Sequence, residues 1–537
     1  MPTSSLFKKH KTVDSLRRTE KEKMLNWLAE PNSCPGLFYE TPAQDGFLVR
    51  IRTPGGLLNQ QQGRAIAELF TELATVVDPW GSETIQVTNR ANLQIRSTHP
   101  PTPEVFQTLQ DLGLAAQNPG VDHLRNVMTS PTAGIDPLEL TDTRPLVQAL
   151  DTYIQSHPAL AGLPAKFSVG IDGGGAVGVG TRSTIFWEHR YNEIQLSAVL
   201  VEQPANDSIV PADVYFRLAL GADKQLCNTS VLIEPDDCVA VVAAIATAYL
   251  DYVNQAAKSP KKPRMKHLLQ EWGVEYYLQQ VNGYLPQPLR QMTHSPILPP
   301  TQPHGHLGIH PQQQLGLSYI GISLQLGQLT AAQLLGMVQL SETFGSGDLR
   351  LTPWQTVLLP DIPNERVTEV VQTLSLLGLS ASSDRPHSAI AACAGKPGCA
   401  ASATHTQTDA IALINHLSQQ FTLNCPVNIH LTGCKKSCAQ PSPAEITLLG
   451  TTFEQQGAIV EGYHIYIGDD QESLKYHLGD AIATDVSFLI EQLLHLYQQH
   501  QKSPKESFRE FVSRYSISDL KSLTPASKLE NSTLKTA

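Results

Sequence analysis

Hydrophobic positions alternate with polar ones in several short stretches, and a segment with helical spacing follows each of them. Residues 45–56 (DGFLVRIRTPGG) and 317–329 (LSYIGISLQLGQL) alternate as strands do. Residues 81–97 (GSETIQVTNRANLQIRS) give a strand, a turn and a second strand before the next helical segment. The pattern predicts a mixed α+β protein in which short strands and helices alternate.

The same order of elements occurs twice. Residues 105–114 (VFQTLQDLGL) and 370–379 (VVQTLSLLGL) are identical at seven of ten positions, at an offset of 265. Residues 345–360 (GSGDLRLTPWQTVLLP) match the segment at 81–97 with an offset of 264. Two unrelated units can share strand–helix patterns by chance, but register kept over three elements favours duplication. We therefore predict a duplicated α+β unit.

Composition narrows the class of protein. A length of 537 residues suggests three to four domains, and 41% hydrophobic with 17% charged residues excludes disorder as the main state. The chain shows no run of 18 apolar residues and no signal-peptide pattern, which predicts a cytoplasmic protein without a membrane span. The net charge of −11 excludes a general nucleic-acid binder, so an anionic ligand requires a local basic site. A glycine cluster at 171–182 lacks a strand-to-helix transition, which excludes a dinucleotide-binding fold.

Four of the eight cysteines are clustered as Cys393-x5-Cys399, then 34 residues, then Cys434-x3-Cys438. Zinc sites usually contain tight Cys-x2-Cys pairs, whereas wider spacing suits a 4Fe–4S cluster held by four thiolates. Neighbouring glycines allow close backbone approach, and neighbouring lysines offset the negative charge of a cluster. Zinc and inert thiols are the alternatives. The remaining cysteines are predicted to be buried structural thiols, namely Cys34, Cys227, Cys238 and Cys425.

The segments CAGKPGC and TGCKKSC resemble the cluster motif of the siroheme-dependent sulfite and nitrite reductases. TNRANLQIR, LRNVMTSPTAGID and LPAKF resemble the same superfamily, so the likeness covers most of residues 34–515. It implies internally duplicated ferredoxin-like half-domains plus α/β domains that bind a cluster and a tetrapyrrole. In those reductases the fourth cysteine, here Cys438, also ligates the iron of siroheme.

The resemblance also divides the chain into segments. We predict an N-terminal extension (1–33), a first ferredoxin-like half-domain (34–120), a first copy of the 4Fe–4S-type domain (121–303), a second half-domain (304–385), the cluster-binding second copy (386–515) and a disordered tail (516–537).

Basic residues of the superfamily converge on the distal face of the tetrapyrrole. Matched motif by motif, they are Arg90, Arg125 and Lys166, which we predict to be catalytic and substrate-binding, with Arg96 as a further substrate-binding residue. Arginine suits this task because its planar fork pairs with a carboxylate through two hydrogen bonds. Ion pairs with neighbouring acids are the alternative role. Ser168 stands where sulfite reductases have Lys and nitrite reductases commonly have Asn, which disfavours sulfite reduction.

Within the superfamily, the precorrin-3B synthases are the most similar family. Cys34-Pro35-Gly36 resembles their early CPG motif, and residues 433–441 (GCKKSCAQP) resemble their GC-x-K-x-CA-x-P motif. This resemblance implies an oxygenase of aerobic cobalamin biosynthesis, which hydroxylates precorrin-3A at C20 with O2 and closes a lactone. Residues 308–321 (GIHPQQQLGLSYIG) instead resemble assimilatory nitrite reductases. The alternative function is therefore a siroheme-dependent ferredoxin–nitrite or sulfite reductase, and a third is a tetrapyrrole-binding paralogue without activity.

The oxygenase interpretation implies specific cofactors and partners. They are a 4Fe–4S cluster, a mononuclear non-haem iron in place of siroheme, and electrons from NADH or a ferredoxin-type redox protein. His304, His306 and His310 crowd one loop and are candidate iron ligands, although loop histidines more often have no metal. Arg50 and Arg52 lie two apart, hence on one face of a strand, and are further candidates for binding substrate carboxylates.

Overall fold

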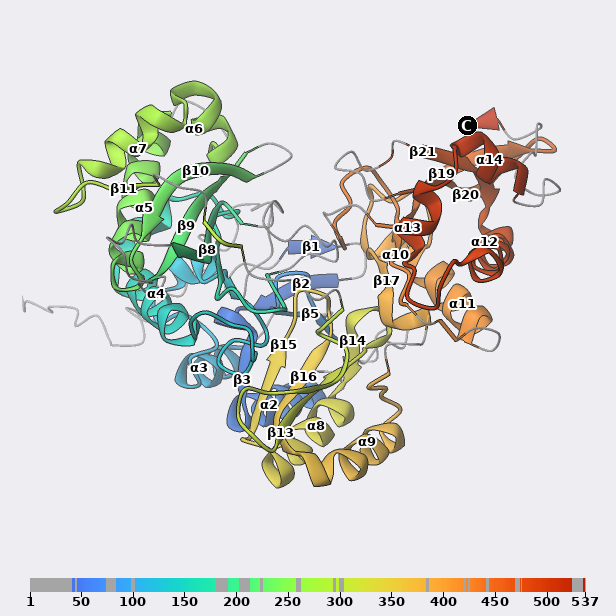
Figure 1. Ribbon diagram of the computed structural model, residues 1–537, viewed down its shortest axis with the longest axis horizontal. Coiled ribbons are helices and arrows are strands. Elements are labelled where there is room, and N and C mark those ends of the chain that lie inside the picture. The colour runs from blue at the N-terminus through green and yellow to red at the C-terminus, as the bar shows by residue number, and fades with distance from the viewer. Residues whose placement is uncertain are drawn as a thin grey trace, which may run out of the picture.

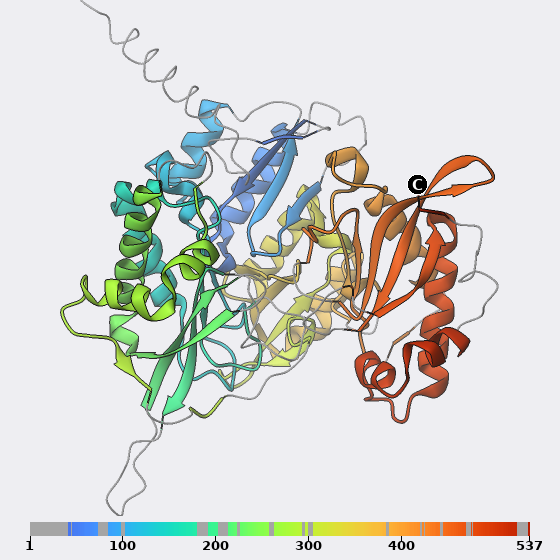
Figure 2. The same ribbon diagram turned by 90° about the horizontal axis from the view of Figure 1, so that it is seen from above.

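The computed structural model describes most of the chain. The described residues are 41–43, 46–73, 84–97, 102–179, 192–201, 213–222, 226–256, 262–292, 296–298, 304–382, 386–418, 422–423, 425–440, 444–468, 474, 476–523 and 535–536. Their strands form four sheets, two in the centre and one on either side (Figures 1 and 2). The predicted extension 1–33 and the CPG motif at 34–36 lie outside the described residues.

The two central sheets are built from two half-domains with the same order of elements. The first half-domain contains β1 (Thr41–Ala43), β2 (Gly46–Ile51), η1 (Pro54–Gly56), β3 (Leu57–Asn59), α2 (Gln60–Leu73), β4 (Thr84–Val87), β5 (Leu93–Ser97) and α3 (Pro103–Asp111). The second contains β12 (Gly308–Pro311), β13 (Leu317–Ile322), η6 (Gln325–Gly327), β14 (Gln328–Thr330), α8 (Ala331–Phe344), β15 (Asp348–Leu351), β16 (Val357–Pro363), η7 (Asn364–Arg366) and α9 (Val367–Leu376). The predicted duplication is confirmed.

The half-domains exchange one short strand each. The sheet orders are β1-β2-β5-β4-β14 and β12-β13-β16-β15-β3, so β14 completes the first sheet and β3 completes the second. The exchange is antiparallel in both places, with Leu329 opposite Ile85 and Leu58 opposite Leu349. One hydrophobic core therefore joins both half-domains, because the side chains of the exchanged strands are buried among residues of the partner sheet.

The repeated LGL segments end equivalent helices in the same way. Gly113 follows α3 with φ +70° and Gly378 follows α9 with φ +72°, the left-handed conformation in which only glycine is free of strain. The amide of Leu114 donates to the carbonyl of Leu109 at 2.8 Å, and that of Leu379 donates to Leu374 at 2.9 Å. The sequence identity at these positions thus encodes a shared helix C-terminus.

Two flanking domains lie outside the half-domains. The first flanking domain contains η2 (Pro119–Leu124), β6 (Val127–Thr129), α4 (Arg144–Ser156), η3 (Pro158–Gly162), β7 (Val169–Asp172), β8 (Ile194–Val201), β9 (Asp213–Gly221), β10 (Leu226–Ile233), η5 (Pro235–Asp237), α5 (Cys238–Gln255), α6 (Met265–Trp272), α7 (Val274–Asn282) and β11 (Arg290–Gln291). The second, here called the cluster domain, contains η8 (Pro386–Ala389), β17 (Ile390–Ala392), α10 (Gly395–Gly398), α11 (Thr406–Ser418), β18 (Ile429–Thr432), β19 (Ile446–Gln455), β20 (Ala458–Ile467), β21 (Tyr476–Ile482), η9 (Ala483–Asp485), α12 (Val486–His500), α13 (Phe508–Ser513), α14 (Ile517–Leu523) and β22 (Lys535–Thr536).

The flanking domains share one topology. In the first, β6, β7 and β8 are parallel and β9 and β10 continue the sheet antiparallel. In the cluster domain, β17, β18 and β19 are parallel and β20 and β21 continue antiparallel. A helix crosses between the first two strands of each sheet, and a long helix follows the last large strand. The fold class predicted from the sequence is confirmed, whereas the exact segment limits stay a prediction.

The C-terminal segment differs from its predicted disorder. Residues 517–523 form α14, and Leu520 is buried in the core of the cluster domain. Leu520, with Ile517 packed beside it, anchors this helix to the core, and the polar composition of the segment does not reveal these two contacts. Within the described residues, no helix combines the length and the apolar character that crossing a bilayer requires.

Candidate cluster site

The four clustered cysteines follow two neighbouring strands. Cys393 comes directly after β17, and Cys434 comes two residues after β18. These strands are parallel and paired, with Ala392 opposite Leu431, so their carboxyl ends meet at one edge of the sheet. Two loops far apart in the sequence therefore carry their thiols to the same place.

The two loops pack tightly against each other. The amide of Gly433 donates to Cys393 Sγ at 3.2 Å, and Thr406 Oγ1 donates to the carbonyl of Cys393 at 2.8 Å. A Cβ atom at Gly433 would lie 1.7 Å from Ser402 Oγ, so no larger residue fits there. Gly395 has φ +72°, which a side chain would strain. The glycines predicted to permit close approach do so.

The spacing of the sulfur atoms favours a cluster over a single ion. Four thiolates on one zinc ion lie about 3.8 Å apart, given a Zn–S bond of about 2.3 Å. Among the described residues, which include all four of these cysteines, no three of the sulfurs lie within 4.8 Å of one another. Burial and the three other thiols raise the pKa of Cys438, while the Lys166 ammonium acts in the opposite direction. The thiols are close enough to interact electrostatically and too far apart for one zinc ion, which fits a 4Fe–4S cluster.

Cys438 differs from the other three thiols. It is exposed, whereas Cys393, Cys399 and Cys434 are partly buried. An exposed fourth thiol can contact a second group beyond the cluster. This fits a tetrapyrrole whose iron shares Cys438, the arrangement that the reductase motif implies.

Two other parts of the fold supply side chains to the cysteine loops. Asn89, in the turn between β4 and β5, donates from Nδ2 to the carbonyls of Cys438 at 3.1 Å and Ala439 at 3.3 Å. The guanidinium of Arg96 lies against Gly398, because a Cβ there would be 2.7 Å from Arg96 Nη1. Lys166, from the first flanking domain, is near enough to Cys438 to act on the pKa of its thiol. The first half-domain and the first flanking domain thus supply polar and basic groups to the cluster domain.

Arg90 occupies the same turn as Asn89. The amide of Thr88 donates to Asn92 O at 2.8 Å, and that of Ala91 donates to Thr88 O at 2.9 Å, which closes the turn. Ala91 adopts φ +54°, an uncommon conformation for a residue with a side chain. The turn therefore holds Arg90 one residue from the contact with the Cys438 loop. Its predicted role in catalysis stays a prediction.

Arg125 is buried among acidic side chains of the first flanking domain. The guanidinium of Arg125 is 2% exposed and binds Asp151 through both Nε and Nη2, at 2.8 and 3.0 Å. Nη2 also donates to the carbonyl of Gly113 at 2.7 Å, and Nη1 lies 3.7 Å from Asp122. These ion pairs raise the pKa of Arg125 against the opposing effect of burial. The contacts favour the alternative role, an ion pair with neighbouring acids, and catalysis by Arg125 stays an untested prediction.

Arg50 and Arg52 also lie inside the fold. Arg50 Nη2 donates to Gln94 Oε1 at 2.7 Å, across the β2–β5 pair. Arg52 is 1% exposed. Burial raises the pKa of Asp122 against the nearby charges of Arg125 and Arg52, and burial together with the charge of Arg52 lowers the pKa of His123. Arg52 therefore belongs to the same buried charge cluster as Arg125.

Ser168, at the position that the sequence analysis compared with sulfite and nitrite reductases, lies inside the first flanking domain. It is fully buried, and its Oγ accepts a hydrogen bond from the amide of Glu193 at 3.3 Å. Its backbone carbonyl accepts from the amides of Glu193 and Ile194 at 3.1 Å. The residue joins the start of β8 to the preceding loop, and what Ser168 implies about the substrate stays a prediction.

The histidines of the HGHLGIH loop do not form a metal site. His306 is buried and stacks on Trp354 with ring centroids 4.2 Å apart. His310 Nε2 lies 2.6 Å from the carbonyl of Leu307, and its ring stacks on Tyr319. No three metal-ligating atoms of this loop lie within 4.8 Å of one another, and every residue of the loop is described. Ring stacking and backbone contacts orient these side chains instead, so the geometry of this loop does not support the predicted iron site.

Two contacts of the cysteine loops were not predicted from the sequence, those made by Asn89 and Glu461. Asn89 lies inside the TNRAN motif next to Arg90, and the motif does not indicate that its amide contacts the Cys438 loop. Glu461 on β20 accepts from Lys396 Nζ at 2.5 Å and from the amide and Nδ1 of His405. Lys396 therefore has a carboxylate partner in addition to any cluster charge. A pairing across 65 residues leaves no local signal in the sequence.

Comparisons with known proteins agree with this architecture. Residues 39–112 and 310–377 match the nitrite/sulfite reductase ferredoxin-like half domain, and residues 120–199 and 206–289 match the nitrite and sulphite reductase 4Fe-4S domain. The ferredoxin–nitrite reductase of Synechococcus elongatus is 30% identical over 476 residues, which is 87% of each chain. The chloroplastic ferredoxin–nitrite reductase of Zea mays is 30% identical over 491 residues, covering 88% of this chain and 80% of the relative.

A solved structure shows the same fold. The Mycobacterium tuberculosis NirA protein superposes with a TM-score of 0.70 at 22% identity, covering 88% of this chain and 84% of that one. The matched half-domains coincide with the two repeats, and the matched 4Fe-4S domain coincides with the first flanking domain, whose topology the cluster domain repeats. The chain belongs to the nitrite/sulfite reductase family.

Proposed function

We propose that the protein is a siroheme-dependent nitrite reductase with a 4Fe–4S cluster. The observation that carries the proposal is the convergence of Asn89, Arg96 and Lys166 on loops that hold four suitably spaced thiols, one of them exposed. Such a site combines a redox centre with cationic groups, which an anionic substrate and a carboxylate-bearing tetrapyrrole both require.

This proposal corrects the oxygenase interpretation. The relatives that match over most of the chain are named ferredoxin–nitrite reductases, not precorrin-3B synthases. Precorrin-3A and O2 as substrates, a mononuclear iron and NADH as donor all depended on that interpretation and fall with it. The short motifs around the cysteines misled because they cover few residues, whereas the family likeness extends over both half-domains and the first flanking domain.

The roles of the chain's own residues follow from their positions. The four thiolates would hold the cluster, and Cys438 would also hold the siroheme iron, which together supply electrons one at a time to the substrate. Asn89 fixes the backbone of the Cys438 loop through two hydrogen bonds. Lys166 lies near Cys438 and Arg96 lies against Gly398 in the Cys393–Cys399 loop, and both would bind carboxylates or the substrate anion. The names of the relatives support a ferredoxin as electron donor.

The test is reduction of nitrite by the protein purified under anaerobic conditions. We expect siroheme absorption, about four iron atoms in the cluster, and six-electron reduction of nitrite to ammonium with reduced methyl viologen or ferredoxin. Sulfide production from sulfite that exceeds ammonium production would move the proposal to sulfite reduction. A protein that holds no siroheme after expression with siroheme synthesis intact contradicts it.

A Lys166→Met variant sharpens the test. We expect nitrite turnover to fall by about 10- to 1,000-fold, because one cation near the reacting anion is lost in a partly buried site. Cluster content should not change, since Lys166 donates no ligand. Lys521→Met changes an exposed lysine on α14, more than 80 residues from Cys438 in the sequence; it serves as the matched control and should keep full activity.

A further inference from the structure

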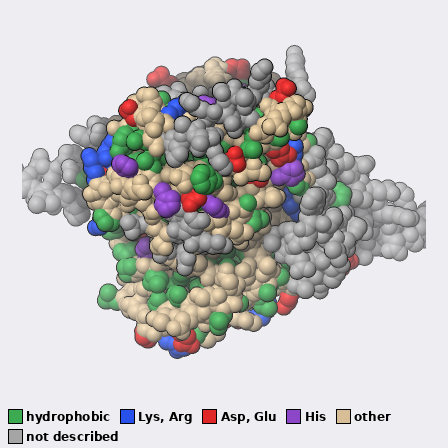
Figure 3. Space-filling model, turned by 90° about the vertical axis from the view of Figure 1, so that its right-hand side faces the viewer, with side chains coloured by type: hydrophobic (Ala, Val, Ile, Leu, Met, Phe, Trp, Pro, Cys, Tyr) green, Lys and Arg blue, Asp and Glu red, His purple; other side chains and the backbone are tan. Residues whose placement is uncertain are grey.

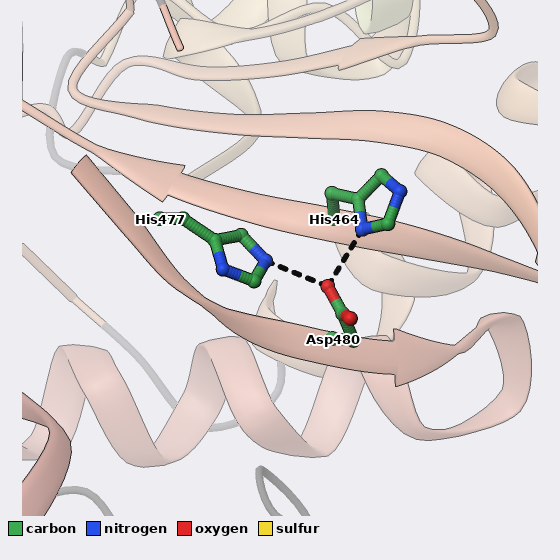
Figure 4. A group of neighbouring side chains, drawn as sticks. All are labelled: His464, His477 and Asp480. Atoms are coloured by element: carbon green, nitrogen blue, oxygen red, sulfur yellow. Dashed lines mark hydrogen bonds and ion pairs between the residues drawn. The ribbon is translucent and has the colours of Figure 1, made fainter. Parts of the chain in front are cut away.

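A second group of metal-ligating side chains lies in the cluster domain, apart from the cysteines. It consists of His464 on β20 with His477 and Asp480 on β21 (Figure 4). Among the described residues it is the one group of three or more His, Cys, Asp or Glu whose ligand atoms all lie within 4.8 Å of one another. Neither the sequence motifs nor the proposed reductase function uses these residues.

An irregularity in the sheet brings the three side chains together. His464 pairs directly with Asp480, so the two lie side by side on one face. His477 is three residues from Asp480, and strict alternation would place it on the opposite face. The register shifts between Ile465 and Tyr466, where His477 pairs with Tyr466 and Leu478 is skipped. A bulge of this kind redirects a side chain, and here it turns His477 toward Asp480.

The three ligand atoms converge on one point. Asp480 Oδ1 lies 2.7 Å from His464 Nδ1 and 2.7 Å from His477 Nε2 (Figure 4). The side chains of His464, His477 and Asp480 are 22%, 40% and 30% exposed, so an ion can reach them from solvent.

Aromatic rings hold the two imidazoles in place. Phe453 meets His464 edge to face with ring centroids 5.6 Å apart, and Tyr466 packs against His477 at 5.3 Å. The two imidazoles are themselves perpendicular, with an interplanar angle of 71°. Rings fixed in this way lose little freedom when an ion binds, which favours binding.

We propose that His464, His477 and Asp480 bind one divalent zinc-type ion. Two imidazoles with one carboxylate form a donor set typical of zinc and its transition-metal neighbours, whereas calcium and magnesium prefer oxygen ligands alone. The ion takes His464 Nδ1, His477 Nε2 and Asp480 Oδ1 as ligands, and water completes the tetrahedron. Each imidazole binds in its neutral form and keeps its proton on the other ring nitrogen.

A second group of two histidines and one acidic residue in the cluster domain lacks the close spacing of the proposed site. Glu491 on α12 lies 2.8 Å from His416 Nε2 and 3.8 Å from His495 Nε2. Histidine and acidic side chains gather on the side of the molecule that carries α11 and α12 (Figure 3). Although the residue types match, their ligand atoms do not all come within 4.8 Å, so His416 provides a matched control.

The experiment measures zinc binding to the cluster-loaded protein by equilibrium dialysis with elemental analysis. We expect one zinc ion per chain beyond the content of the cluster. Asp480→Asn and His464→Gln should each weaken binding at least 100-fold, because loss of a ligand exceeds the roughly 10- to 100-fold effect of losing a residue behind a ligand. His416→Gln should bind as the unmodified protein does, and magnesium should not compete.

X-ray absorption at the zinc edge separates this site from the cysteines. Binding at the proposed site gives nitrogen and oxygen neighbours at about 2.0–2.2 Å and no sulfur. Sulfur at about 2.3 Å would show zinc held by the cysteines, and it would overturn the proposal, as would equal affinity of Asp480→Asn and the unmodified protein. Because the measurement does not depend on nitrite turnover, failure of the reductase proposal would leave the result interpretable.

Discussion

The two flanking domains have the same strand order but close the same edge of the sheet with different chemistry. In the cluster domain, thiols follow the first two parallel strands. In the first flanking domain, Ser130 follows β6 at the position of Cys393, and a run of glycines follows β7 where Gly433 and Cys434 follow β18. One scaffold therefore presents two loops in both domains, and only the loop residues decide what lies between them.

Direct hydrogen bonds join the loops of the first flanking domain. Ser130 Oγ donates to the carbonyl of Val177 at 2.6 Å, and the amide of Val177 donates to Asp136 Oδ2 at 3.2 Å. Thr132 Oγ1 binds the same Asp136 oxygen at 3.1 Å. These contacts lie between the loops that correspond, in strand order, to the cysteine loops of the cluster domain. Loops that bond to each other directly stabilise the fold without a cofactor, whereas the cysteine loops would hold one between them under the proposed function.

The half-domains contact these loops in different ways. Arg350 on β15 is 1% exposed, and its Nη1 donates to the carbonyls of Pro131 at 3.1 Å and Ala133 at 2.6 Å. The first half-domain instead sends Asn89 and Arg96 to the cysteine loops. The second half-domain thus fills the space beside its loop with a buried arginine, and the first leaves polar groups beside an exposed thiol. Duplication thus produced two equivalent pairs of loops. Side chains fill the space beside one pair, in the first flanking domain, whereas polar groups and an exposed thiol line the other pair, in the cluster domain.

The largest expected effect comes from removing one thiol. Cys434→Ser should abolish the cluster and with it all nitrite turnover, because a hydroxyl is a much weaker iron ligand than a thiolate. Iron and acid-labile sulfide analysis measures the loss, and Cys425→Ser, a cysteine outside the cluster motif, is the control. Full iron content in Cys434→Ser would exclude this thiol from the site.

The next effect tests the buried charges of the first flanking domain. Arg125→Ala leaves the fully buried Asp122 and the nearly buried Asp151 without their cation, which we expect to cost about 3–5 kcal/mol of unfolding free energy. Chemical denaturation measures the change. The exposed pair Arg366–Glu369 offers a control, and Arg366→Ala should cost at most about 1 kcal/mol. A stable Arg125→Ala enzyme with a raised KM for nitrite would instead support the predicted substrate-binding role.

The sequence predicted more of the fold than of the candidate site. The repeat of VFQTLQDLGL carries local signals, buried positions four apart and a left-handed glycine, which a helix imposes wherever it occurs. The four cysteines were visible because their spacing is a local pattern as well. Contacts between distant segments were not visible, such as Asn89 with Cys438, and neither was the burial that removed Arg125 and Ser168 from the surface. Whether a basic residue binds a substrate or an aspartate depends on the partner that the fold supplies.

A smaller effect depends on pH. Asp172 ends β7 and accepts from the amide of Gly174 at 2.9 Å, and burial with the nearby Asp136 raises its pKa to about 7. Because the folded pKa lies above the unfolded value of 3.8, the stability that Asp172 contributes is full below about pH 4 and is lost as the pH rises to about 7. Asp172→Asn keeps the acceptor and removes the charge. The variant should gain on the order of 2 kcal/mol relative to the unmodified protein between pH 5 and 8, measured by denaturation at both values. A constant difference would show that Asp172 stays ionised.

The smallest expected effect comes from weakening the hydrogen bonds between the loops of the first flanking domain. Ser130→Ala removes the bond to the carbonyl of Val177, and Ser130 is only 4% exposed, so we expect a loss of about 1 kcal/mol in unfolding free energy. Ser156→Ala, which removes an exposed hydroxyl contact at the end of α4, should change stability by less than about 0.5 kcal/mol. The cluster content should be the same in both variants, because neither residue touches the cysteine loops. A lower iron content in Ser130→Ala would show that the cluster domain depends on the first flanking domain. The hydrogen bonds between the loops of the first flanking domain would then not act independently of the cluster.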